Sequence, residues 1–178
     1  MLTPSSLYPG AKVALLCPSS SVAEDRLEPM VADIKALGLE PVVYPSCYYV
    51  NHHGIFAADD AQRAKDLQDA FADPEIKGIL CLRGGNGCAR LLPLLDWKEI
   101  ARHPKPFYGY SDLTGIHIVL NQRCRMVSYH TPMPIAGWYG NGDEFTLTYL
   151  RKALFGALSG PLPLGETAVT LQGGKARG

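Results

Sequence analysis

The chain has 178 residues, of which 47% are hydrophobic and 19% are charged, and this is enough for one α/β core. Its 17 basic and 17 acidic residues balance, and no basic block indicates a nucleic-acid partner. No apolar run is long enough to span a bilayer, and the N-terminal residues lack the charged and apolar regions of a signal peptide. The five cysteines form no CxxC pair, so we expect reduced thiols in a cytoplasmic protein without a membrane partner.

Apolar runs and helically spaced apolar residues, separated by turn signals such as Pro9-Gly10 and Asp73-Pro74, predict strands that alternate with helices. In chain order, we predict strand 12–17, helix 24–37, strand 41–44, helix 59–72, strand 78–82, helix 88–95, a short helix 97–101, strand 106–110, helix 111–122, strand 125–130 and helix 144–154. The proline- and glycine-rich stretch 159–178 follows. We expect one domain over 1–158 and, over 159–178, a linker toward a C-terminal domain absent from the chain.

The alternation predicts an α/β fold with an open, mainly parallel sheet and helices on both faces, as in flavodoxin-like and class I glutamine amidotransferase-like domains. Ligands of such sheets gather where the carboxyl ends of the strands meet. The segments expected at that edge are 18–21, 83–87, 111–112 and 130–132.

Ser111 lies where the strand 106–110 is expected to turn into a helix. Such a corner lifts a serine hydroxyl clear of the sheet and is typical of a hydrolase nucleophile. The alternative is that Ser111 only caps the helix, since serine is a preferred N-cap residue. Asp112 would then lie in the first turn of that helix, where the positive end of the helix dipole stabilises a carboxylate. The convergence of candidate groups at one edge favours the nucleophile.

The segment Arg83-Gly84-Gly85-Asn86-Gly87 follows another strand and matches neither the GxGxxG pattern nor a Walker loop. An isolated glycine cluster is often only a tight turn. Next to a nucleophile, its backbone N–H groups can form an oxyanion hole together with the N–H of Asp112. Arg83 can pair with a substrate carboxylate or with a surface acid.

A serine nucleophile needs a base, and the chain has five histidines. Only His130 is expected at the edge that holds Ser111, where it can act as a base, position the substrate or simply end a strand. We expect His117 to be a core histidine bonded to the backbone, His103 to be exposed, and His52-His53 to lie in a solvated loop rather than bind a metal.

Two further features allow other interpretations. Cys88 near a helix N-terminus is a minor rival nucleophile, because that position lowers the pKa of a thiol. Trp138-Tyr139 can form a lid or a recognition surface, although a packed aromatic pair is the simpler explanation.

The order of RGGxG, RLLPLLDW, KPFYGYSDLT and HTP, together with the opening PGAKVALLCPSS, resembles the N-terminal domain of the LD-carboxypeptidase family of serine peptidases, family S66. That family includes murein tetrapeptide carboxypeptidases and microcin C self-immunity proteins. The resemblance implies that Ser111 is the nucleophile and that the N–H groups of Gly85 and Asp112 form the oxyanion hole. It implies cleavage of the amide bond between an L-centre and a D-amino acid, as in murein peptides, without a metal or other cofactor, in a protein that is often a homodimer.

By the same resemblance, we expect Arg83, Gly84, Asn86 and His130 to contact a small peptide substrate. The family usually has an aromatic residue in place of Asn86, and His-Gly-Pro in place of His130-Thr131-Pro132. These departures leave the substrate open. The glutamate and histidine that complete the family's triad lie in a second domain, so we expect the chain to be the N-terminal part of a longer protein or an inactive relative.

Two rival functions remain at this point. One is a catalytically incomplete module that binds a peptide or an anion at the same edge. The other is a flavodoxin-like binder of phosphate or a nucleotide at residues 83–87.

Overall fold

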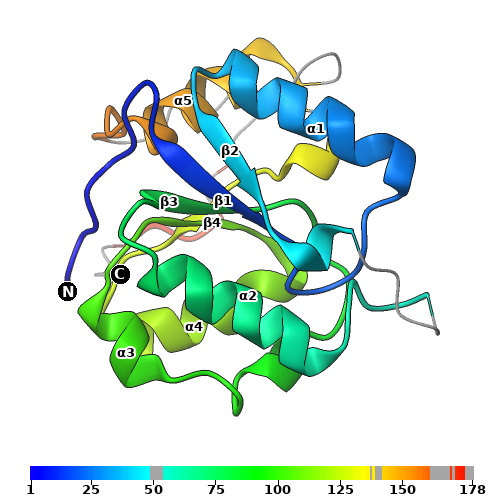
Figure 1. Cartoon of the computed structure of the whole chain (residues 1–178). Coiled ribbons are helices and arrows are strands. Elements are labelled where there is room, and N and C mark those ends of the chain that lie inside the picture. Colours follow the sequence, from blue (N-terminus) through cyan, green and yellow to red (C-terminus); the bar gives the residue numbers. More distant parts are fainter. Residues whose placement is uncertain (49–53, 137, 139–141, 161–168, 170, 175–178) are drawn as a thin grey trace.

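The computed structural model describes the whole chain except residues 49–53, 137, 139–141, 161–168, 170 and 175–178 (Figure 1). Its strands are β1 (Lys12–Leu16), β2 (Glu40–Val43), β3 (Gly78–Cys81), β4 (Phe107–Gly109) and β5 (Tyr129–His130). Its α-helices are α1 (Glu24–Ala36), α2 (Asp60–Ala72), α3 (Trp97–Arg102), α4 (Thr114–Gln122) and α5 (Glu144–Leu154). Short 3-10 turns are η1 (Pro45–Cys47), η2 (Cys88–Leu91), η3 (Ser111–Leu113) and η4 (Pro134–Ala136).

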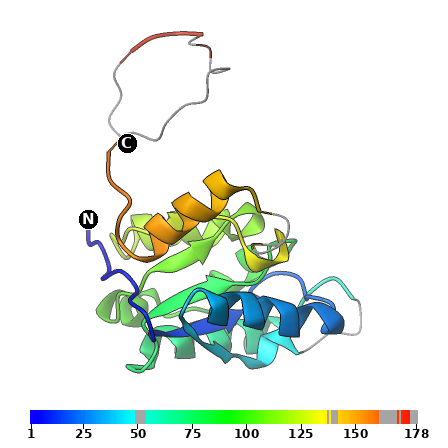
Figure 2. The same ribbon diagram turned by 90° about the horizontal axis from the view of Figure 1, so that it is seen from above.

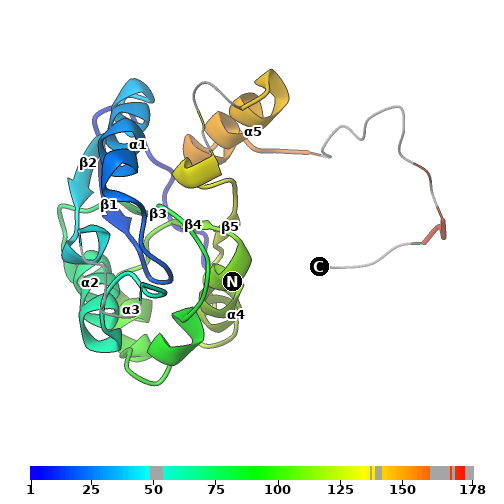
Figure 3. The ribbon, with the colours of Figure 1, turned by 90° about the vertical axis from the view of Figure 1, so that its right-hand side faces the viewer.

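The strands form one parallel sheet in the order β2-β1-β3-β4-β5. Helices α1 and α5 cover one face, and α2, α3 and α4 cover the other (Figures 1 and 3). Seen from above, α1 and α5 lie in front of the strands (Figure 2). The predicted α/β fold with a parallel sheet is therefore confirmed.

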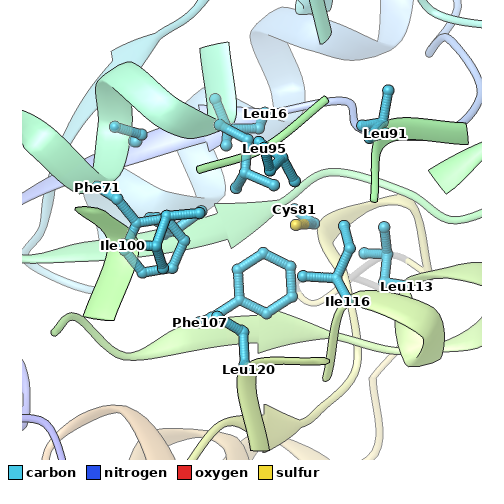
Figure 4. Close-up of a cluster of buried hydrophobic side chains, with 14 of the residues drawn as sticks. Leu16, Phe71, Cys81, Leu91, Leu95, Ile100, Phe107, Leu113, Ile116 and Leu120 are labelled. Atoms are coloured by element: carbon cyan, nitrogen blue, oxygen red, sulfur yellow. The ribbon is translucent and has the colours of Figure 1, made fainter. Parts of the chain in front are cut away.

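The sheet has one apolar core on each face, because successive side chains along a strand point to opposite faces. In β1, Ala14 and Leu16 face the core under α2, α3 and α4, whereas Val13 and Leu15 face the core under α1 and α5. Burial on both faces explains why the central strands read as continuous apolar runs. Phe107 of β4 lies within the first core, with α4 side chains beside it (Figure 4).

Three predicted elements differ from the structure. The helix predicted over 88–95 is only the turn η2, and α4 begins at Thr114 rather than at Ser111. The strand predicted over 125–130 is reduced to β5, and Met126 instead forms an isolated parallel bridge with Leu2. Much of 159–178 lies outside the described residues, so the linker stays a prediction.

Because all five strands run parallel, the loops that follow β1, β3, β4 and β5 meet at one edge of the sheet. This edge holds the segments that the sequence singled out.

Candidate active site

Ser111 has a backbone conformation that a serine rarely adopts. It follows β4 by one residue, its side chain is exposed, and its φ is 66°, in the left-handed region. Such a conformation costs an L-residue about 1–2 kcal/mol. Neither η3 nor α4 has a side-chain cap, so the interpretation of Ser111 as a helix cap is wrong.

The segment 83–87 after β3, which we call the glycine loop, contacts Ser111 directly. A Cβ built on Gly84 would lie 2.9 Å from the Cβ and 3.1 Å from the Oγ of Ser111. A Cβ on Gly85, whose φ is 121°, would lie 2.2 Å from the Oγ of Ser20. A larger residue at Gly84 would push the glycine loop away from Ser111 and Asp112, which form the serine corner between β4 and α4. A larger residue at Gly85 would push it away from Ser20 in the loop after β1.

Ser20 fixes the direction of the peptide group between Gly84 and Gly85. The Ser20 N–H donates to the Gly84 carbonyl at 3.3 Å, and the Asn86 N–H donates to the Ser20 Oγ at 3.2 Å. In a planar trans peptide the C=O and N–H point in opposite directions, so the Gly85 N–H points away from the Ser20 N–H. Within the described residues, neither the Gly85 N–H nor the Asp112 N–H has a hydrogen-bond acceptor.

The Asp112 carboxylate joins three of the loops at this edge. It accepts from the Ser19 hydroxyl at 2.7 Å and from the Cys88 N–H at 2.9 Å. Asp112 lies in the first turn of η3, as expected, but its carboxylate bonds to two other loops rather than capping a helix. An anion bound at the start of η2 would compete with this carboxylate, which disfavours a phosphate site at residues 83–87.

Cys88 does not have the reactive character that its position suggested. Burial is the main cause that raises the pKa of its thiol to about 12, and the nearby Asp112 carboxylate adds to it. The Cys88 Sγ donates to the Asp112 carbonyl at 2.6 Å. The thiol stays protonated at neutral pH, so the rival role as a nucleophile is wrong.

The residues expected to contact substrate lie around Ser111. Gly84 is buried against it, whereas Asn86 and His130 are exposed. His130 lies opposite Gly109 in the sheet, and its ring packs edge-to-face on Tyr110 at 5.9 Å. Arg83 pairs with no surface acid within the described residues; its Nη1 donates to the Ser21 carbonyl at 2.8 Å.

Of the other histidines that the structure describes, His117 lies next to His130, with ring centroids 6.0 Å apart, but both of its ring nitrogens are already bonded. His117 is bonded through Nε2 to the Gly109 carbonyl at 2.9 Å and through Nδ1 to Ser128, as expected of a core histidine, and burial lowers its pKa. His103 contacts Glu99 on the surface. His52-His53 fall outside the described residues, and no group of three His, Cys, Asp or Glu in the described part could hold a metal.

A pocket of about 440 Å³ opens at Tyr110, the residue before Ser111, and at the end of β5. It is lined by Tyr110, His130, Thr131, Pro132, Ala136, Trp138, Gly142, Asp143 and Thr146. Trp138 is buried, which fits packing better than a lid, and Tyr139 lies outside the described residues. Two buried polar atoms of lining residues, the Thr131 Oγ1 and the Trp138 Nε1, have no hydrogen-bond partner.

The sequence predicts residues 18–21 at this edge but indicates no role for them. The structure shows that Ser19 and Ser20 connect the serine corner to the glycine loop. The only signal in the sequence was a run of three serines directly after a buried strand.

An α/β sheet with a strained serine between a strand and a helix, facing a glycine loop, is the arrangement of a serine hydrolase. Residues 13–131 match the model of the LD-carboxypeptidase N-terminal domain, peptidase S66, and the chain belongs to this family.

Relatives and solved structures agree with this assignment. A putative carboxypeptidase of Streptomyces coelicolor is 41% identical over 87% of this chain and 50% of its own length. A probable murein peptide carboxypeptidase of Bacillus subtilis is 35% identical over 73% of this chain and 40% of its own length. The crystal structure of muramoyltetrapeptide carboxypeptidase from Oxalobacter formigenes superposes with a TM-score of 0.69 and 30% identity, covering 79% of this chain and 47% of that one.

The chain therefore spans about half the length of the relatives it matches. None of the helices in the described residues has both the length and the apolar character needed to cross a bilayer.

Proposed function

We propose that the complete protein is a serine carboxypeptidase that hydrolyses the amide bond between an L-centre and a terminal D-amino acid in murein peptides. The observation that carries the proposal is the left-handed Ser111, exposed at the end of β4 and in contact with Gly84. Two relatives, named a probable murein peptide carboxypeptidase and a muramoyltetrapeptide carboxypeptidase, support the class of substrate.

In this mechanism, the Ser111 Oγ attacks the carbonyl carbon of the scissile amide. The N–H groups of Gly85 and Asp112 donate to the oxygen on which negative charge develops. The Ser111 proton passes to a histidine, which we place with its glutamate partner in the half of the protein beyond this chain. The histidine then protonates the leaving D-amino acid, and water hydrolyses the acyl-enzyme.

The pocket lined by Tyr110 and His130 is the proposed site for one flank of the peptide. Its lining is mostly apolar and aromatic, with His130 at the end of β5. A small peptide can place an aliphatic side chain there while its backbone crosses the serine corner.

The test measures release of D-alanine from a tetrapeptide ending in diaminopimelate–D-alanine by the full-length protein. Ser111→Ala should lower the rate at least about a thousandfold, because the nucleophile is removed. Ser159→Ala, which removes an exposed serine remote in sequence, is the matched control and should keep the wild-type rate. Persistent release by Ser111→Ala would contradict the proposal.

A further inference from the structure

Arg63 of α2 is a buried cation that the proposed mechanism does not use. The residue is only 1% exposed, and its side chain makes several polar contacts. Its Nη1 donates to the Pro18 carbonyl at 2.6 Å and to the Ser19 carbonyl at 3.4 Å. Its Nε donates to the Ala58 carbonyl at 3.1 Å, so the guanidinium holds the loop after β1 and the segment before α2 together.

The charge of Arg63 is balanced by Asp60, whose carboxylate lies 2.5 Å from the Arg63 Nη2. The same carboxylate binds the exposed Arg90 at 2.6 Å. The hydrogen bond from Arg90 is the first cause that lowers the pKa of Asp60. The Asp60 side chain is 25% exposed, so this ion pair is only half buried, and the contacts specific to Arg63 are those with the backbone carbonyls.

The Arg63 cluster also touches the glycine loop. A Cβ on Gly87 would lie 3.0 Å from the Arg63 Nη1 and 2.8 Å from the Phe56 ring. The Phe56 ring centroid lies 4.9 Å from the Arg63 Cζ and 5.4 Å from the Arg90 Cζ. Arg63 thus contacts the loop after β1 and lies against the end of the glycine loop.

A short series of bonds links Arg63 to the reacting groups. Arg63 holds the carbonyls of Pro18 and Ser19, and the next residue, Ser20, holds the Gly84 carbonyl through its N–H. The Ser19 hydroxyl holds the carboxylate of Asp112, the residue that follows the nucleophile. Both proposed oxyanion donors are therefore within a few bonds of the loop that Arg63 fixes.

We propose that Arg63 is a positioning residue for the oxyanion hole: by fixing residues 18–20, it sets the direction of the Gly85 N–H relative to Ser111. This inference rests on the proposed function. A donor aimed at the developing charge stabilises the transition state more than the bound substrate. Loss of its alignment should therefore lower kcat and leave KM nearly unchanged.

The test compares Arg63→Lys and Arg63→Met with Arg90→Lys and Arg90→Met in the full-length protein. A lysine has one ammonium and lacks the planar fork that serves the carbonyls and Asp60 together. Both Arg63 variants should lose about 10- to 100-fold in kcat at similar KM, with Arg63→Lys the less affected. Arg90 contacts the same Asp60 carboxylate and Phe56 ring as Arg63 but has no bond to residues 18–20. The Arg90 variants should therefore keep the wild-type kcat.

A second measurement separates this inference from the proposed function. In ¹⁵N NMR spectra of the full-length protein, the amide resonances of Gly85 and Asn86 should shift in Arg63→Lys and stay in place in Arg90→Lys. Such selective shifts without peptidase activity in the wild type would overturn the proposed function alone. Folded Arg63 variants with unchanged kcat and unchanged Gly85 resonances, or a rise in KM at constant kcat, would overturn the role of Arg63.

Discussion

Among single residues, Ser111 combines an exposed side chain with a backbone conformation that favours glycine. Arg125, with a φ of 54°, is the other non-glycine residue in this region among those described. Strain of this kind persists only where the surrounding contacts maintain it. At Ser111 these contacts are the packing against Gly84 and the bonds of the neighbouring Asp112.

Ser111→Gly should therefore stabilise the protein while it removes the proposed nucleophile. We expect a gain of up to about 1 kcal/mol in the free energy of unfolding, measured by urea titration, because glycine relieves the left-handed strain. Ser111→Ala keeps the strain and should show no gain. Arg125→Gly should give a similar gain with full activity. Equal stability of Ser111→Gly and Ser111→Ala would argue against strain at this corner.

The glycine loop and the serine corner were evident in the sequence because both depend on local residue types at the ends of apolar runs. The hydrogen bonds that join them could not be predicted, because Ser19 and Asp112 are far apart in the sequence and no local pattern indicates their contact. Arg63 reads as an ordinary polar residue of an amphipathic helix. Its burial follows from the carbonyls that meet it in three dimensions.

At the scale of elements, the strands were predictable because the sheet is covered on both faces and its strands are continuously apolar. The helix predicted over 88–95 failed for a local reason. Pro93 lacks the N–H that would continue the series of helical hydrogen bonds, so η2 ends after Cys88–Leu91 although Leu92 keeps right-handed helical angles. Likewise, Ser111 cannot begin an α-helix at a φ of 66°, and α4 starts three residues later.

Helix α2 carries Arg63, and its N-terminus depends on Asp59. The Asp59 carboxylate accepts the Gln62 N–H at 2.7 Å, as an N-cap does. Asp59→Ala should lower the free energy of unfolding by about 1 kcal/mol, whereas Asp59→Asn, which retains a capping oxygen, should lose little. Denaturant titration of the two variants measures the difference. If alanine and asparagine prove equally stable, the cap contributes nothing.

At the scale of the whole molecule, parallel order brings the loops after β1, β3, β4 and β5 to one edge, and the two apolar cores hold that edge in place. The opposite end of the sheet contains a second buried cation. Lys105, just before β4, donates from its Nζ to the Ala70 carbonyl at 2.9 Å and also to the Asp73 carbonyl. Burial lowers its pKa to about 8.

Stability should therefore depend on pH through Lys105. In the unfolded chain, the pKa of a lysine is about 10.4, so between pH 8 and that value the unfolded state binds more protons than the folded state. The free energy of unfolding of the wild type should rise with pH across this window, relative to Lys105→Met. Chemical denaturation at a series of pH values tests this. A constant difference between the two proteins from pH 7 to 10.5 would contradict a lowered pKa for Lys105.

The role proposed for the Ser111 hydroxyl is that of the nucleophile of this site. Its most direct test is labelling of the full-length protein with a fluorophosphonate, which reacts with activated serines, followed by peptide mapping. We expect one label, on Ser111, with parallel loss of D-alanine release and no label in Ser111→Ala. A label on another residue, or full peptidase activity after complete labelling of Ser111, would contradict it.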